Sequence, residues 1–301
     1  MYDVVLLTEN RYLNPENPDW YVRQILLEDG LVEKALISNG LRTTRLTWDD
    51  PNFNWSETSY ALFRTTWDYF HRFQKFKSWL SDSSLKTRFI NPIETILWNL
   101  DKHYMGDLQR KGVRIVPTHF IPAKDHSSLS SWFSKCDKIK CVVKPVVSGG
   151  ARNTFVVHED NLGELEQSFH SLIEKEAYMI QPFQKNIVEQ GEISLMCIAG
   201  EVTHAVLKIA KEGDFRVQDD FGGTVHIHKP TSEEIDFARK AIYACEQLPV
   251  YARVDVVYDN DGQLALCELE LIEPEMWFRQ LPEAASLLAH CISDLVINDT
   301  H

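Results

Sequence analysis

The feature that most constrains the fold is the stretch YARVDVVYDNDGQLALCELELIE, residues 251–273. Two runs that alternate apolar and polar residues flank a tight-turn sequence, which predicts an antiparallel β-hairpin with its turn at Asp259–Gly262. Placing Tyr258 opposite Gln263 puts Glu268 roughly opposite Arg253, because side chains alternate along each strand. The hairpin is therefore expected to have one apolar face and one charged face.

The charged face of the hairpin is predicted to carry Arg253, Asp255, Leu266, Glu268 and Glu270. The core face is predicted to carry Val254, Val256, Ala265, Cys267, Leu269 and Leu271. Carboxylates about 5 Å apart repel by roughly 3 kcal/mol at an effective dielectric constant near 20, and one arginine does not neutralise three acids. A divalent cation held by Asp255, Glu268 and Glu270 would neutralise these acids. An all-oxygen donor set favours Mg²⁺ or Mn²⁺ over zinc. The alternative is a solvated polar face of an edge hairpin, on which such acids cost little.

The first hundred residues alternate strand and helix signals, which predicts a small parallel sheet with helices on its faces. Strands are expected at 3–7, 42–48 and 60–67, and helices at 20–38 and around 71–80. Asn91–Pro92 breaks the chain and opens a further helix, which is expected to continue through Lys102 to Gly112.

After about residue 113 short strands dominate the chain. They are expected at 115–121, 138–145, 153–158, 178–183 and, as a pair joined at Ala199–Gly200, at 193–209; helices are expected at 161–175, 231–248 and 281–296. The predicted architecture is mixed, an α/β part followed by two α+β lobes. We expect an α/β domain at 1–97, a central subdomain at 98–185 and a C-terminal subdomain at 186–301.

Composition limits the partners. The formal net charge is −13, which argues against nucleic acid or an anionic membrane as the main partner but not against a small anionic ligand. The N-terminus has no basic region typical of a signal peptide, and no apolar run approaches the roughly 20 residues that span a bilayer. Six scattered cysteines without a C-x-x-C pair are typical of reduced thiols, so we expect a cytoplasmic protein.

Four cations lie where they could hold phosphate: Lys102, Lys144, Lys208 and Arg216. Lys144 and Lys208 end β-like runs, so the strand determines where each ammonium points; taken singly, each cation is more often a solvated surface charge. Lys144 precedes SGGARNT, in which Ser148, Gly149 and Gly150 suit a flexible lid whose backbone N–H groups approach phosphate oxygens. The alternative is a mobile hairpin loop.

The order of these motifs resembles the ATP-grasp superfamily, in its glutathione synthetase and D-alanine–D-alanine ligase branches. ARVDVV followed by CELELIEPE is similar to the D-x-x-x…E-x-N signature that holds two Mg²⁺ ions in those ligases. On that resemblance Asp255, Glu268 and Glu270 are the metal ligands, with Glu270 in place of the usual asparagine. The runs RTTWDY, WNLDK and ELELIEP resemble the family of the D-cycloserine biosynthesis cyclo-ligase (O-ureido-D-serine cyclo-ligase).

The same resemblance implies an ATP-grasp fold with an N-terminal pre-ATP-grasp domain, and it implies roles for further residues. Lys102 and Lys144 then hold the α- and β-phosphates, and the backbone at Gln181, Pro182 and Phe183 reads adenine. Glu189 is the first choice for the ribose-binding acid, with Glu192 as the alternative. The segment KIAKEGDFRVQDDFGG resembles a glutathione synthetase pattern, with matches at Lys208, Arg216, Gln218, Gly222 and Gly223.

The resulting hypothesis is an ATP- and Mg²⁺-dependent carboxylate–amine or cyclising ligase that acts on a small amino-acid-like substrate through an acyl phosphate and releases ADP and phosphate. Lys208, Arg216 and Arg253 are the expected catalytic cations, with Arg253 at the reacting phosphoryl and acyl groups. Substrate contacts are expected from the strand end RTTWDY and from the glycine pair, namely Arg64, Trp67, Asp68, Tyr69, Gly222 and Gly223. The alternative role for Asp68 is a helix cap.

Two other functions use the same site: an ATP-dependent phosphotransferase acting on a hydroxyl group, and a nucleotide-sensing module without catalysis. The first differs in its products and the second in forming no ADP. The resemblance also makes a homodimer the expected assembly.

Overall fold

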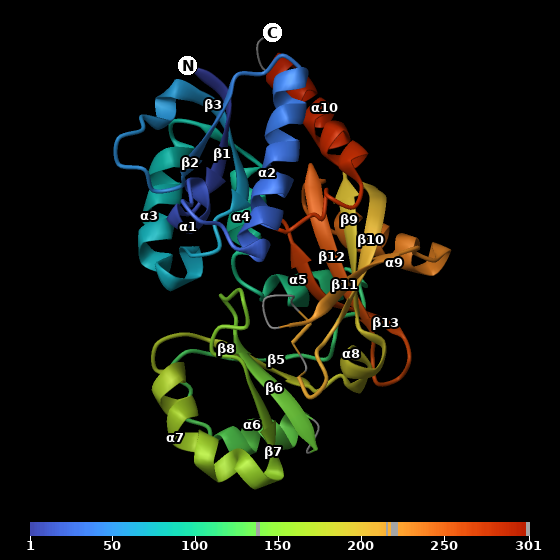
Figure 1. Ribbon diagram of the computed structural model, residues 1–301. Helices are drawn as coiled ribbons and strands as arrows, with labels where there is room; N and C mark the ends of the chain where they lie inside the picture. Colours follow the sequence, from blue (N-terminus) through green and yellow to red (C-terminus); the bar gives the residue numbers. More distant parts are fainter. Residues whose placement is uncertain (137–138, 215, 218–221, 299–301) are drawn as a thin grey trace.

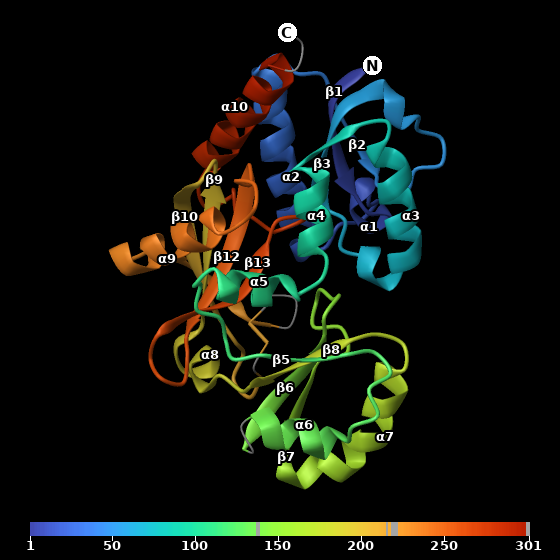
Figure 2. The same ribbon diagram turned by 180° about the vertical axis from the view of Figure 1, so that it is seen from behind.

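The computed structural model describes residues 1–136, 139–214, 216–217 and 222–298, and within them the chain forms three β-sheets. Figure 1 shows the N-terminal sheet beside the C-terminal helix, and a separate lower lobe formed by the middle of the chain. The view from behind shows the strands of residues 192–270, coloured yellow to orange, above this lobe (Figure 2). The chain therefore leaves the upper part of the molecule and returns to it.

The first sheet is parallel, with the strand order β2-β1-β3-β4. Its elements are β1 Tyr2–Thr8, α1 Asn10–Leu13, α2 Trp20–Ser38, β2 Thr43–Thr47, the short 3-10 helix Trp55–Glu57, β3 Thr58–Thr65, a second 3-10 helix Tyr69–His71, α3 Phe73–Ser84 and β4 Arg88–Ile90. Leu6 packs with Leu36 of α2, whereas Leu7 packs with Phe76 of α3, so the two long helices cover opposite faces. This confirms the predicted parallel sheet; β4 was not predicted.

The single helix predicted from Asn91–Pro92 to Gly112 is wrong. The chain forms two helices, α4 Ile93–Asn99 and α5 Tyr104–Arg110, separated by a turn that contains Lys102. The Lys102 backbone N–H donates to the Val146 carbonyl (2.9 Å), which replaces a bond within a helix. The break turns a lysine predicted to lie on a helix toward the centre of the molecule, where it is 8% exposed.

The second sheet is antiparallel, with the order β5-β8-β6-β7. Its elements are β5 His119–Ile121, α6 Leu129–Cys136, β6 Lys140–Pro145, β7 Phe155–His158, the 3-10 helix Glu159–Asn161, α7 Leu162–Ile173 and β8 Tyr178–Pro182. Phe133 of α6 and Phe169 of α7 pack against Val143, so both helices cover one face. The strands and α7 match the prediction, and α6 was not predicted.

The third sheet is antiparallel, with the order β11-β10-β9-β12-β13. Its elements are α8 Lys185–Gln190, β9 Glu192–Ile198, β10 Glu201–Ile209, β11 Thr224–His228, α9 Ser232–Tyr243, β12 Tyr251–Tyr258, β13 Leu264–Glu270 and α10 Pro282–Asn298. A Thr231–Glu234 capping box begins α9, as its sequence predicts. Leu288 of α10 packs with Val32 of α2, which joins the two ends of the chain. None of the described helices is both long and apolar enough to cross a membrane.

Candidate active site

The predicted hairpin is present as β12 and β13, but its register differs from the prediction. Tyr258 pairs with Leu264 rather than Gln263, and a β-bulge leaves Cys267 unpaired, so that Glu268 lies opposite Asp255 and Glu270 opposite Arg253. The bulge and the shifted turn reverse three predicted orientations. Ala265, predicted on the face of Val254, packs with Val116 and Val257 instead. Leu266, predicted on the charged face, is fully buried in the core, and Cys267, predicted on the core face, lines a cavity. Alternation counted from the turn does not reveal an inserted residue.

The cavity has a volume of about 530 Å³ and lies where the three sheets meet. Most of the predicted site residues line it. From the predicted nucleotide and metal sites these are Lys102, Lys144, Ser148, Gly149, Gly150, Gln181, Pro182, Phe183, Glu192, Lys208, Arg216, Arg253, Asp255, Glu268 and Glu270, together with Trp67 and Tyr69 from the first sheet. The fold thus gathers side chains that lie more than 200 residues apart in the sequence.

Among the three hairpin carboxylates, Asp255 is the most tightly held. It accepts hydrogen bonds from Ser194 Oγ (2.6 Å) and Arg253 Nη2 (2.8 Å), and Lys208 Nζ lies 3.4 Å away. Burial opposes ionisation, but the Arg253 and Lys208 charges prevail and lower the pKa of Asp255 to about 2. Asp255 is therefore a carboxylate at neutral pH.

Glu268 and Glu270 also contact cations, but the pKa values of their carboxyl groups shift in opposite directions. Glu268 lies 2.9 Å from Lys102 Nζ; burial opposes ionisation, but Lys102 and Lys144 lower the pKa of its carboxyl group. Glu270 contacts Arg253, yet burial and the neighbouring carboxylates raise its pKa to about 8. The adjacent cations therefore keep Asp255 and Glu268 ionised, whereas Glu270 favours its protonated form at neutral pH.

The donor set of this hairpin fits a hard divalent cation in chemistry, because it consists of carboxylate oxygens on adjacent strands that line one cavity. In the part of the chain that the structure describes, however, no three His, Cys, Asp or Glu side chains are grouped closely enough to enclose a metal. Glu268 is paired with Lys102 and Glu270 with Arg253 instead. Metal binding would exchange these ion pairs for metal contacts.

The predicted phosphate cations come from different elements. Lys102 lies in the turn between α4 and α5 and donates from Nζ to the Ser148 carbonyl (2.8 Å). It therefore joins the glycine loop, residues 148–154, to Glu268. Lys144 comes from β6 and is half-buried. Lys208 of β10 is buried and contacts Glu192, and Arg216 forms an ion pair with Asp214 (2.6 Å).

The glycine loop rests against the first sheet. A Cβ atom added to Gly149 would lie 2.7 Å from Cε1 of Phe70, so any side chain there would displace the Phe70 ring, a contact that the sequence did not predict. Arg152 fastens the loop, since its guanidinium donates to Glu176 (2.6 Å) and to the Val147 carbonyl (2.8 Å). The loop therefore forms a wall of the cavity between the second sheet and Phe70.

The segment predicted to bind adenine and ribose is only partly as expected. Gln181 lines the cavity and its side-chain amide donates to Thr118 Oγ1 (2.8 Å), while the Phe183 backbone N–H donates to the Lys140 carbonyl (2.9 Å) and is thus used inside the protein. Glu189 is exposed on α8 and does not line the cavity, whereas Glu192 does. Of these two acids only Glu192 lies where a ligand in the cavity could contact it, because α8 turns Glu189 outward.

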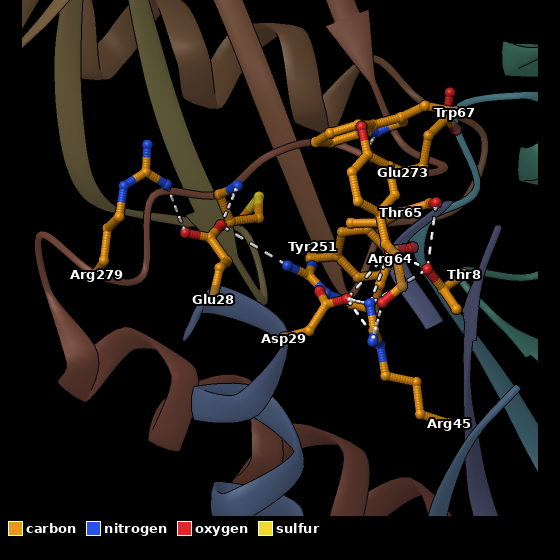
Figure 3. Close-up of polar contacts among 12 residues, drawn as sticks. Thr8, Glu28, Asp29, Arg45, Arg64, Thr65, Trp67, Tyr251, Glu273 and Arg279 are labelled. Carbon is orange, nitrogen blue, oxygen red and sulfur yellow. Dashed lines mark hydrogen bonds and ion pairs between the residues drawn. The ribbon is translucent and has the colours of Figure 1, made fainter. Parts of the chain in front are cut away.

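Several predicted substrate residues also lie outside the cavity. Arg64 is buried and pairs with Asp29 (3.2 Å) and Glu28 (3.7 Å) on α2, as Figure 3 shows. Asp68 accepts a hydrogen bond from Trp48 Nε1 (2.8 Å) and contacts Arg72; it precedes the 3-10 helix at 69–71 without capping it through its side chain.

The two glycines are not lining residues either: Gly222 is exposed and Gly223 half-buried. Gln218, matched to the same pattern, lies outside the described residues.

Further residues line the cavity: Glu9, Tyr12 and Trp277 were not predicted, whereas the sequence places Glu273 and Glu275 just beyond the hairpin as entry or rim groups. Glu9 and Tyr12 follow β1 at the carboxyl end of the parallel sheet, the edge at which such sheets bind ligands. Glu273, Glu275 and Trp277 follow β13 and line the same region. Burial raises the pKa of Glu273 to about 7. A search for polar residues directly after predicted strands would have found Glu9, which follows Thr8 at the end of β1.

Comparisons with known proteins agree with this arrangement. Residues 109–260 match the family model of the prokaryotic glutathione synthetase ATP-grasp domain, and residues 4–91 match the N-terminal domain of the D-cycloserine synthetase DcsG. The chain is 28% identical over 258 residues to the cycloserine biosynthesis protein DcsG of Streptomyces lavendulae, covering 79% of this chain and 83% of that protein.

Solved structures show the same fold. The crystal structure of D-cycloserine synthetase DcsG matches with a TM-score of 0.83 and 22% identity over 97% of this chain and 99% of that one. A D-alanine–D-alanine ligase from Bacillus anthracis complexed with ATP matches with a TM-score of 0.66 and 15% identity, over 99% and 98% of the two chains. The ATP-grasp ligase PsnB, in a complex with Mg and ADP, matches with a TM-score of 0.62 and 13% identity over 97% of each chain.

Proposed function

This chain belongs to the ATP-grasp ligases, and from that premise we propose that it uses ATP to activate the carboxyl group of a small amino-acid-like substrate and joins that group to an amine. The amine belongs either to a second molecule or to the same one, which then cyclises. The observation that carries the proposal is the charge arrangement of one cavity. Four cations from different parts of the chain converge there beside the three hairpin carboxylates, namely Lys102, Lys144, Lys208 and Arg253.

The reaction divides into two steps. A substrate carboxylate oxygen attacks the γ-phosphorus of ATP, the bond to the bridging oxygen breaks, and ADP leaves as the acyl phosphate forms. The amine nitrogen then attacks the acyl carbon, the carbon–oxygen bond to phosphate breaks, and the nitrogen loses a proton. Both steps need positioning and charge stabilisation more than covalent help from side chains.

The residues of this chain have distinct parts in that sequence. Lys102 and Lys144 neutralise the transferred and leaving phosphate oxygens, and Arg253 with Lys208 faces the reacting carboxyl group. Asp255, Glu268 and Glu270 would hold Mg²⁺, which shields polyphosphate charge when it is bound. The glycine loop excludes water, which would hydrolyse an acyl phosphate.

The substrate end of the cavity lies at the carboxyl edge of the first sheet. Trp67 and Tyr69 remain the candidate contacts there, joined by Glu9, Tyr12 and Glu273. The cycloserine-forming relative supports the cyclising form of the reaction, in which acid and amine come from one molecule.

The test is a screen of D- and L-amino acids and their O-ureido and amide derivatives for ADP formation, with inorganic phosphate measured in parallel. A ligase releases phosphate and ADP in equal amounts, and added hydroxylamine converts its acyl phosphate into a hydroxamate. ADP without free phosphate would identify a phosphotransferase. ATP binding without ADP under every acceptor would identify a sensing module and refute the proposal.

A further inference from the structure

The segment 273–279 follows β13 and forms one wall of the cavity. At its centre Trp277 adopts a positive φ of 46°, a region that residues with a Cβ disfavour. Its side chain is 3% exposed, and its indole Nε1 is buried without a hydrogen-bond partner among the residues that the structure describes. Neither the backbone conformation nor the indole N–H is favourable by itself, so other contacts must hold the ring in place.

The ring of Trp277 lies over two of the proposed catalytic cations. Arg253 Cζ is 5.3 Å from the ring centroid and Lys208 Nζ is 5.8 Å from it, both within the range of a cation–π contact. Both cations are buried and both also contact Asp255. The guanidinium and the ammonium thus each contact an aromatic ring and a carboxylate.

The segment is anchored from two distant parts of the chain. The Met276 N–H donates to Glu28 Oε1 of α2 (2.8 Å), and His204 Nε2 on β10 donates to the Met276 carbonyl (2.8 Å). Glu28 also accepts a bond from Arg279 (3.0 Å), as Figure 3 shows. The residue just before Trp277 is therefore held on both of its backbone polar groups.

We propose that Trp277 is a positioning residue that orients Arg253 and Lys208, and that Glu28 of the first sheet's helix α2 holds Trp277 in that role. The assignment rests on the proposed function of Arg253 and Lys208 at the reacting groups. On this proposal the N-terminal part of the chain supports the catalytic cations and also lines the substrate end of the cavity. The strained backbone at Trp277 is maintained because Glu28 and His204 bind its neighbour.

The test compares Trp277→Phe, which keeps a ring over the cations, with Trp277→Leu, which keeps apolar bulk without one. With an acceptor found in the screen, Trp277→Leu is expected to lower kcat for ADP formation about 30-fold, the scale of a desolvated cation–π contact. Trp277→Phe is expected to recover most of that loss. The calorimetric Kd for ATP with Mg²⁺ should stay within about twofold in both variants, because the phosphate-binding Lys102 and Lys144 are unchanged.

Trp79→Leu is the matched control for loss of a buried indole. The Trp79 Nε1 is likewise buried without a partner, but its ring packs on Trp48, Trp55, Phe63, Phe76 and Phe89 and does not line the cavity. This variant should lose thermal stability and keep kcat within about twofold. A Trp277→Leu enzyme with wild-type kcat, or a Trp277→Phe enzyme as impaired as Trp277→Leu, would overturn the proposal.

A second readout does not need turnover. In protein labelled with ¹⁵N-arginine, the Arg253 Nε–H resonance, identified by its loss in Arg253→Lys, should shift in Trp277→Leu and remain near its wild-type position in Trp277→Phe. An unchanged resonance in Trp277→Leu refutes the contact. If no acceptor stimulates ADP formation in the wild-type protein, the proposed function fails, and this resonance still decides whether Trp277 orients Arg253.

Discussion

The edge of strand β13 provides the sharpest prediction, because side chains complete the hydrogen bonds of Leu269 and Leu271, whereas backbone groups of residues 114–116 bind Leu266. Asn99 Nδ2 donates to the Leu269 carbonyl (2.8 Å), and Asn99 Oδ1 accepts from the Leu271 N–H (2.9 Å). The Tyr104 hydroxyl accepts from the Leu269 N–H (2.9 Å), and Asn91 donates to the Leu271 carbonyl (2.8 Å). These bonds hold the strand that carries the Glu268 and Glu270 carboxylates.

Replacing Asn99 with alanine leaves the Leu269 carbonyl and the Leu271 N–H buried without partners. Each such group costs about 1–3 kcal/mol, so the free energy of unfolding should fall by about 2–6 kcal/mol. A shift of β13 by about 1 Å would misplace the carboxylates and lower ADP formation about 100-fold. Urea denaturation measures the first effect, and hydrogen exchange of peptides covering 264–273 should become faster than in the wild type.

Asn39→Ala is the control for this substitution, since the Asn39 amide donates to a single helix-end carbonyl, that of Ala35 (2.9 Å). Its loss should stay below about 1 kcal/mol. An Asn99→Ala protein that loses less than about 1 kcal/mol, with unchanged hydrogen exchange in 264–273, would refute the role assigned to this edge.

Three further predictions follow from the cavity and its surroundings. Glu268→Gln should lose about 1000-fold in ADP formation while it keeps its thermal stability; turnover near the wild-type rate would remove Glu268 from the metal site. Lys144→Ala should weaken ATP binding about tenfold or more by calorimetry, and an unchanged Kd would count against the phosphate assignment. Arg64→Met should cost about 3 kcal/mol of stability, because it leaves the buried Asp29 and Glu28 carboxylates with fewer partners, and should leave KM for the acceptor within about twofold. A selective rise in that KM without a stability loss would restore Arg64 to the substrate site.

Local patterns in the sequence were sufficient for most of the elements. Helix α2 has the predicted bounds, Trp20–Ser38, and the Asp19 carboxylate caps it by accepting the Val22 N–H (2.8 Å). The hairpin β12–β13, the parallel first sheet and the two strands joined at Ala199–Gly200 also match the prediction. Capping, turn residues and alternation act between residues that are near neighbours in the chain, so they can be recognised in the sequence without knowledge of the fold.

Predictions that depended on distant contacts were wrong in identifiable ways. The helix through Lys102 breaks because Lys102 finds partners near residues 146–148 and at Glu268, and no helical pattern encodes them. Arg64 ends a strand, as the chemistry of a binding site requires, yet α2 supplies two acids that bury it. Whether an arginine serves a ligand or the core depends on which carboxylates the fold brings to it.

The sequence alone therefore determined the kinds of residue in the site and the elements that carry them, from the carboxylate hairpin to the lysines at strand ends. Tertiary structure decided which of those residues share a cavity and which way they face. The reason is physical: a bulge of one residue at Cys267 exchanges the faces of Leu266 and Cys267, and the position of α8 turns Glu189 outward while Glu192 faces the cavity. Such choices depend on packing between segments far apart in the chain, and Trp277 over Arg253 is the clearest instance.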